Sequence, residues 1–111
     1  MNVFYWLIGH FSNRGKALSF YKRGWARAQK HDHHGAIDHF TTAISLPDTP
    51  TDLRATALYE RGLTHVAAGD DLKGVDDLNA ILAMEEALVN VKTMARQQLV
   101  RMGSPYAQSK V

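Results

Sequence analysis

The sequence predicts an all-α fold built from a repeated pair of helices. Tyr21-Lys-Arg-Gly24 returns as Tyr59-Glu-Arg-Gly62 at an offset of 38 residues, and a period of this size is typical of helical repeat proteins. Elsewhere in the chain, apolar residues recur at steps of three and four, which is the period of an α-helix. No segment reads as a β-strand with alternating polarity. We therefore expect antiparallel helix-turn-helix units that stack into a short solenoid.

The composition limits the chain to a single globular domain of ordinary chemistry. It has 111 residues, of which 45% are hydrophobic and 22% charged, and both fractions are close to globular averages. Its formal net charge of +2 is too small to indicate a nucleic-acid partner by itself. The absence of cysteine excludes disulfides and thiolate sites, and it fits a reducing, cytoplasmic location.

Residues 1–15 form a separate apolar N-terminal segment. Its apolar run consists of Val3, Phe4, Tyr5, Trp6, Leu7 and Ile8. The run lacks the charge and cleavage pattern of a signal peptide, and it is too short to span a bilayer. Since Ser12-Asn-Arg-Gly15 contains turn residues, we expect this stretch to end any helix that the segment forms.

The first helix pair follows this segment. Residues 16–30 keep the helical period, and Asp32 is a suitable N-cap for a second helix that ends at about Leu46. Pro47 and Pro50 stop that helix, because proline has no backbone N–H to continue the hydrogen-bond ladder.

The second pair and a fifth helix occupy the rest of the chain. Thr51 or Asp52 is expected to cap the third helix, and Gly69-Asp-Asp71 to separate it from the fourth. A fifth helix is predicted at about residues 86–102, followed by a polar, flexible tail at residues 104–111.

The repeated residues resemble those of the tetratricopeptide repeat family, whose unit is a helix-turn-helix of about 34 residues. Each first helix has a large apolar residue four positions before a glycine, namely Phe20 before Gly24 and Leu58 before Gly62. A glycine has no Cβ, so it allows the two helices of a unit to approach closely. The second helix of the first unit carries a small–large–small set that is typical of the family: Ala36, Phe40 and Ala43.

The resemblance implies a short right-handed α-solenoid over residues 16–103. The first repeat covers about residues 17–50, the second about 55–86, and a capping helix about 86–102. Because such arrays usually need three repeats for stability, we expect the N-terminal segment or a second copy of the chain to supply additional burial.

The resemblance also implies a function, namely binding of a partner protein or peptide in a concave groove lined by the first helix of each pair. The predicted groove residues are Tyr21, Trp25, Gln29, Tyr59, Leu63, Gln97 and Arg101, together with Leu18, Val66, Asn90 and Thr93. Tyr21, Trp25 and Tyr59 are the expected anchors, although aromatic residues at helical spacing can also be core residues. The lysine and asparagine of the family's carboxylate clamp are absent, which favours an apolar or mixed peptide.

Three alternatives remain open at this stage. Val3–Ile8 could mediate self-association into a homo-oligomer. His31, His34 and Asp38 are weak candidates for a metal site, with a solvated polar turn as the simpler interpretation. A basic helix face is the third feature, consisting of Lys16, Arg23, Arg27 and Lys30.

We expect no nucleic-acid binding from this basic face, because Arg23 and Arg61 are better explained as partners of Asp38, Asp76 or Asp77. The sequence contains no phosphate-binding glycine loop, serine elbow or zinc-protease motif. A non-catalytic protein without a cofactor is therefore expected.

Overall fold

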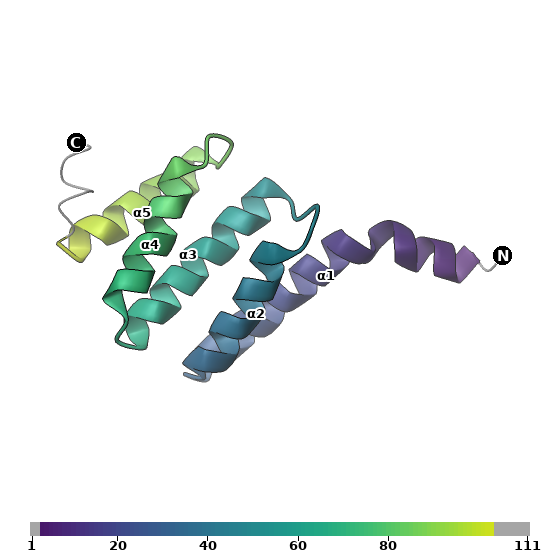
Figure 1. The fold of residues 1–111 in the computed structure, drawn as a ribbon, viewed down its shortest axis with the longest axis horizontal. Coiled ribbons are helices and arrows are strands. Elements are labelled where there is room, and N and C mark those ends of the chain that lie inside the picture. Colours follow the sequence, from purple (N-terminus) through teal and green to yellow (C-terminus); the bar gives the residue numbers. More distant parts are fainter. Residues whose placement is uncertain (1–2, 104–111) are drawn as a thin grey trace.

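The computed structural model describes residues 3–103, with side chains from residue 14 onward, and this part of the chain forms five α-helices (Figure 1). They are α1 (Val3–Gln29), α2 (His33–Ser45), α3 (Thr51–Ala67), α4 (Asp71–Ala83) and α5 (Val89–Arg101). The prediction of an all-α protein is confirmed for these residues. The predicted flexible tail, residues 104–111, lies outside the described residues.

The helices are arranged in chain order, each packed against the next (Figure 1). In addition, α1 contacts α3 and α3 contacts α5, whereas α2 and α4 do not contact each other within the described residues. Helices α1, α3 and α5 therefore share one side of the molecule, and α2 and α4 share the other (Figure 1).

One aspartate caps the start of the second helix in each pair, as predicted. The Asp32 carboxylate accepts a hydrogen bond of 3.0 Å from the backbone N–H of Gly35. The Asp70 carboxylate accepts one of 3.1 Å from Lys73 N–H. Gly69 precedes Asp70 with φ of +91°, a left-handed conformation that glycine adopts without a steric penalty. Both turns are thus specified by local sequence.

The start of α3 differs from the prediction of a Thr51 or Asp52 cap. Pro50 occupies the N-cap position, and no side chain caps the helix there. Proline suits this position because backbone N–H groups at the start of a helix have no acceptor within the helix, so the absence of one costs no hydrogen bond. Thr49 holds the preceding turn together, since its buried hydroxyl donates to the carbonyl oxygens of Ala43 and Leu46, both at 2.9 Å.

The prediction that residues 12–15 end the first helix is wrong. Helix α1 runs unbroken for 27 residues from Val3 to Gln29, and it crosses the expected boundary at residue 15. Gly15 is not among the residues with positive φ, so its backbone continues the helical ladder. A glycine within a helix costs only about 1 kcal/mol, which the neighbouring helical residues offset.

Close packing within each helix pair depends on the repeated glycine, as predicted. A Cβ on Gly24 would lie 2.7 Å from two ring carbons of Phe40, which is fully buried in α2. A Cβ on Gly62 would lie 3.2 Å from Asp77 Cβ and 3.3 Å from the Gly74 carbonyl oxygen. A Cβ at Gly24 would therefore force the Phe40 ring to move, whereas one at Gly62 would need its neighbours to shift by only a few tenths of an ångström.

Arg61 ties α3 to α4, whereas Arg23 has no equivalent role. The Arg61 guanidinium donates two hydrogen bonds to Asp77, of 2.7 and 2.8 Å, and both side chains are largely buried. Arg23 instead lies over the Phe20 ring, 5.2 Å from its centroid. The residue 38 positions before Asp77 is His39, so the first repeat offers no carboxylate there, and the predicted pairing of Arg23 is wrong.

Candidate functional site

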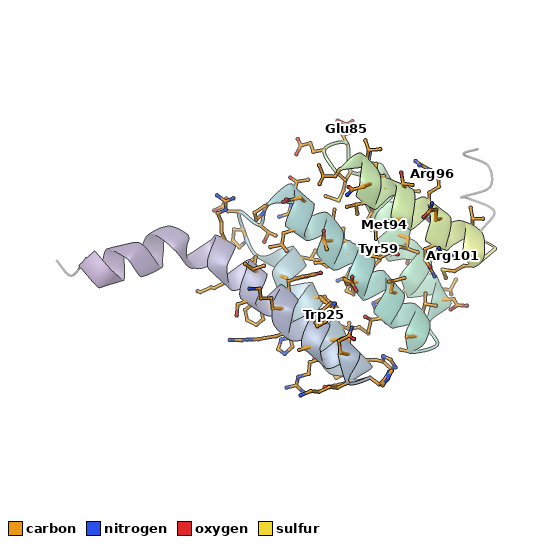
Figure 2. All side chains as sticks on the ribbon, turned by 180° about the vertical axis from the view of Figure 1, so that it is seen from behind. Trp25, Tyr59, Glu85, Met94, Arg96 and Arg101 are labelled. Carbon is orange, nitrogen blue, oxygen red and sulfur yellow. The ribbon has the colours of Figure 1, made fainter. Side chains whose placement is uncertain are left out.

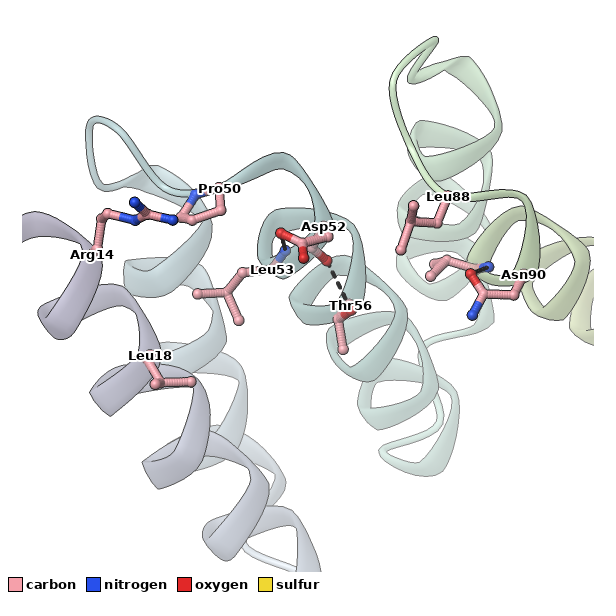
Figure 3. Close-up of a pocket in the computed structure, with 9 residues that line it drawn as sticks. Arg14, Leu18, Pro50, Asp52, Leu53, Thr56, Leu88 and Asn90 are labelled. Atoms are coloured by element: carbon pink, nitrogen blue, oxygen red, sulfur yellow. Dashed lines mark hydrogen bonds between the residues drawn. The ribbon is translucent and has the colours of Figure 1, made fainter.

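A groove with a volume of about 490 Å³ opens between α1, α3 and α5 (Figure 3). Its lining residues are Arg14, Leu18, Pro50, Asp52, Leu53, Thr56, Leu88, Asn90 and Val91. Each of the three helices on this side contributes residues. The groove lies at the end of this face where α3 and α5 begin. Two of the predicted groove residues, Leu18 and Asn90, line it. The other predicted residues are not among its lining: Tyr21, Trp25, Gln29, Tyr59, Leu63, Val66, Thr93, Gln97 and Arg101.

Three leucines form the apolar part of this groove. Leu18 projects from α1, Leu53 from the first turn of α3, and Leu88 directly precedes α5 (Figure 3). Leu18 is 43% exposed and Leu88 is 53% exposed. Arg14 and Asn90 place polar groups at its two ends, and Asp52 and Thr56 lie between Leu53 and Leu88 (Figure 3). The groove therefore offers a partner both apolar and polar contacts.

Trp25 continues the exposed apolar surface along α1. It lies two helical turns beyond Leu18 and is 49% exposed. Figure 2 shows Trp25, Tyr59 and Arg101 on the same side of the molecule, on α1, α3 and α5 in that order. Gln29, one turn after Trp25, is also exposed. Trp25 is therefore the predicted anchor with the most apolar surface available to a partner.

The two predicted tyrosine anchors, Tyr21 and Tyr59, are packed against other parts of the protein. Tyr21 packs its ring 5.9 Å from the Phe40 ring, measured between centroids. Tyr59 is half-buried and packs against the main hydrophobic core. Burial raises the pKa of both phenols, and the charge of Glu60 raises it further. Leu63 is likewise half-buried.

Sequence analysis did not select Glu60, whose charge raises the pKa of both tyrosines. It lies on α3 one helical turn after Thr56, which lines the groove. Burial raises the pKa of the Glu60 carboxyl above its usual 4.5. Among the described side chains, no cation forms an ion pair with it. A half-buried carboxylate without a partner cation thus lies beside the groove.

We expect Glu60→Gln to stabilise the protein at pH 7 but not at acidic pH. The raised pKa means that the folded state binds this proton more tightly than the unfolded state. The resulting stabilisation is complete below about pH 4.5 and is lost as the pH rises through the folded-state pKa. Glutamine removes the cost of burying the charge, so urea unfolding followed by circular dichroism should show a higher free energy of unfolding at pH 7.

The control for this experiment is Glu85→Gln, because Glu85 is exposed in the turn between α4 and α5. This change should alter stability little at either pH. A Glu60→Gln variant that behaves like Glu85→Gln at pH 7 would contradict the cost of burial at Glu60.

Leu53, Leu88 and Glu60 are the surface residues that sequence analysis missed. A signal for two of them exists, since Leu53, Thr56, Glu60 and Leu63 follow each other at steps of three, four and three along one face of α3. The polar members break the apolar pattern and so conceal the stripe. Leu88 lies just before α5, where helical periodicity carries no information.

The predicted residues of α5 lie on a shallow hollow of their own. Gln97 and Arg101 are exposed and line it together with Thr93, Arg96 and Val100, and its volume is about 450 Å³. The positive charge of Arg101 lowers the pKa of Tyr59, which opposes the effect of Glu60. Arg101 and Glu60 thus act on Tyr59 with opposite charges.

The histidine cluster does not converge on one point. His34 Nε2 lies 3.5 Å from Asp38 Oδ2, with both side chains well exposed. The His31 ring instead faces the His33 ring, 6.3 Å away. Within the described part of the chain, no group of three histidine or carboxylate side chains is placed to hold a metal ion.

The predicted basic face is partly occupied by internal contacts. Arg27 donates a hydrogen bond of 2.8 Å to the Asp32 carboxylate. The pKa of this carboxyl is lowered, first by the hydrogen bond from Gly35 N–H and second by the one from Arg27. Lys16 and Lys30 remain exposed.

Comparison with protein-family models, with curated proteins and with solved structures gives no match for this chain. The geometry of the α1, α3 and α5 face is therefore the basis for assigning a function.

Proposed function

We propose that the chain is a non-catalytic protein-interaction module of the tetratricopeptide type, which binds a partner peptide on the face of α1, α3 and α5. The observation that carries this proposal is the groove between these helices, continued along α1 by the half-exposed Trp25. Large apolar side chains with this exposure are stabilised when a partner removes them from water.

The helix arrangement supports the family part of the proposal. Helices alternate between two sides, the first helix of each pair contacts the next first helix, and a glycine marks each pair's crossing. In a stacked repeat the first helices line the binding side. We accordingly assign α1–α2 and α3–α4 as two repeats and α5 as the capping helix.

The chemistry of the face indicates the kind of peptide. Leu18, Leu53 and Trp25 offer apolar contacts to two or three apolar side chains of the partner. Glu60 offers a carboxylate whose charge is half-buried without a cation, so a lysine or arginine placed over it would gain an ion pair. We propose a mixed peptide in which apolar residues alternate with at least one basic residue.

Trp25→Ala should weaken peptide binding strongly while leaving the fold intact. Peptides selected from a random library displayed on phage, using the full chain as bait, would be synthesised with a fluorescent label. Fluorescence polarisation should then show a Kd at least about 30-fold higher for Trp25→Ala, since a central tryptophan typically contributes about 2 kcal/mol or more. Circular dichroism of the variant should match that of the parent chain.

The matched control is Leu72→Ala. Leu72 lies on α4, is 80% exposed, and belongs to the other side of the molecule. It should leave the Kd unchanged. If every selected peptide binds Trp25→Ala as well as it binds the parent, or loses affinity in Leu72→Ala instead, the peptide site is not on the α1, α3 and α5 face.

A further inference from the structure

Helix α1 is much longer than the helix that packs against it. It has 27 residues, whereas α2 has 13. Figure 1 shows the first part of α1 projecting away from the other four helices. We refer to residues 3–13 as the arm.

The sequence of the arm is unsuited to water on every side. Val3–Ile8 is a run of six consecutive apolar residues, and six residues cover more than one full turn of an α-helix. The stretch therefore offers no polar residue to water over more than one full turn, a pattern that favours a nonpolar environment. No helix within residues 3–103 is long and apolar enough to cross a membrane.

The charge of α1 limits what could surround the arm. The helix contains no acidic residue and five basic ones: Arg14, Lys16, Lys22, Arg23 and Arg27. All five are exposed, and Arg27 is paired with Asp32. The whole chain has a net charge of only +2, so the rest of it is net negative and the positive charge is concentrated on α1.

We propose that the α1 arm binds the surface of an anionic lipid membrane, with Val3–Ile8 in the interfacial region. Arg14 and Lys22, which lie eight residues apart on one face of α1, would contact the lipid headgroups. Phe4, Tyr5 and Trp6 are residue types enriched at membrane interfaces. Basic residues next to a short apolar segment are attracted to acidic headgroups and add to its membrane affinity. Residues 3–13 contain no lysine or arginine, so the electrostatic part of this binding would come from basic residues that follow the arm, beginning at Arg14.

Vesicle co-sedimentation of the full chain tests this proposal. The probes are vesicles of pure phosphatidylcholine and vesicles that also contain phosphatidylserine at about a third of the lipid. We expect binding to the anionic vesicles to be at least about tenfold tighter, and high salt to weaken it, because screening removes the electrostatic part. In a Trp25→Phe background, Trp6 is the remaining tryptophan, and its emission should shift to shorter wavelength on binding.

Two pairs of variants separate the arm from the body. Leu7→Glu should abolish binding, whereas Leu72→Glu, the same change on exposed α4, should not. Replacing Arg14 and Lys22 by glutamine should weaken binding to anionic vesicles by about tenfold or more. The matched change of Arg101 and Lys73, which removes the same charge elsewhere on the surface, should have a smaller effect.

Three results would overturn the proposal. One is equal binding to both kinds of vesicle. Another is binding that Leu7→Glu leaves intact although circular dichroism shows the variant folded. The third is a full chain that does not bind vesicles and that light scattering shows to be a dimer, if Leu7→Glu dissociates this dimer. In that last case a second copy of this chain covers the arm.

Discussion

Phe40→Ala is expected to lower the free energy of unfolding by about 3–5 kcal/mol, as a large buried aromatic typically does when it is truncated. Phe40 is fully buried in α2 and fills the space that Gly24 leaves on α1. Its ring also contacts Tyr21. Since a domain of this kind has a total stability of only about 5–15 kcal/mol, urea unfolding of Phe40→Leu, a milder truncation, should be measured alongside.

Combining this change with Gly24→Ala tests the helix contact itself. In the parent chain the new methyl group would meet the Phe40 ring at 2.7 Å, so Gly24→Ala should destabilise by about 1–3 kcal/mol. In the Phe40→Ala background the clash is gone, and alanine should be neutral or stabilising because of its helix propensity. Gly15→Ala is the control, since a Cβ there meets nothing within 4 Å. Additive effects of the two changes would contradict the proposed packing.

Arg61→Ala should lower the free energy of unfolding by about 3 kcal/mol or more, the usual result of leaving a buried charge without its partner. Asp77 is only 6% exposed and accepts both hydrogen bonds of the guanidinium. His65 Nε2 lies 3.9 Å from the Asp77 carboxylate, and burial lowers the pKa of its imidazole, while the charge of Asp77 acts in the opposite direction. The measurement is urea unfolding of the variant and the parent chain at pH 7.

Arg23→Ala is the control for this change, because Arg23 stands at the same position of the first repeat. It contacts the Phe20 ring and not a carboxylate, so its loss should cost about 1 kcal/mol or less. The double change of Arg61 and Asp77 to leucine should recover much of the lost stability, since no unpaired charge remains. If Arg61→Ala costs no more than Arg23→Ala, the ion pair does not hold α3 on α4.

Parts of the candidate site were accessible from sequence, and parts were not. Helical periodicity placed Leu18 and Trp25 on one side of α1, because spacing alone decides which residues share a helix face. Both are exposed, and Leu18 lines the groove. It could not say that Tyr21 and Tyr59 would be half-buried, because that depends on how closely α2 and α5 approach them. Periodicity also could not select Glu60, because a half-buried carboxylate that forms no ion pair with a described side chain is recognised only in the tertiary structure.

The sequence by itself determined the local features of this protein. Asp32, Asp70 and Gly69 set the ends of their helices through contacts within a few residues, and the 38-residue repeat predicted two similar helix pairs. Only the tertiary structure decided the rest. The pairing of Arg61 but not Arg23, and the groove between three helices, depend on contacts or their absence between segments far apart in the chain. Periodicity reports which face of a helix is buried, but not the partner, the distance or the charge that meets it.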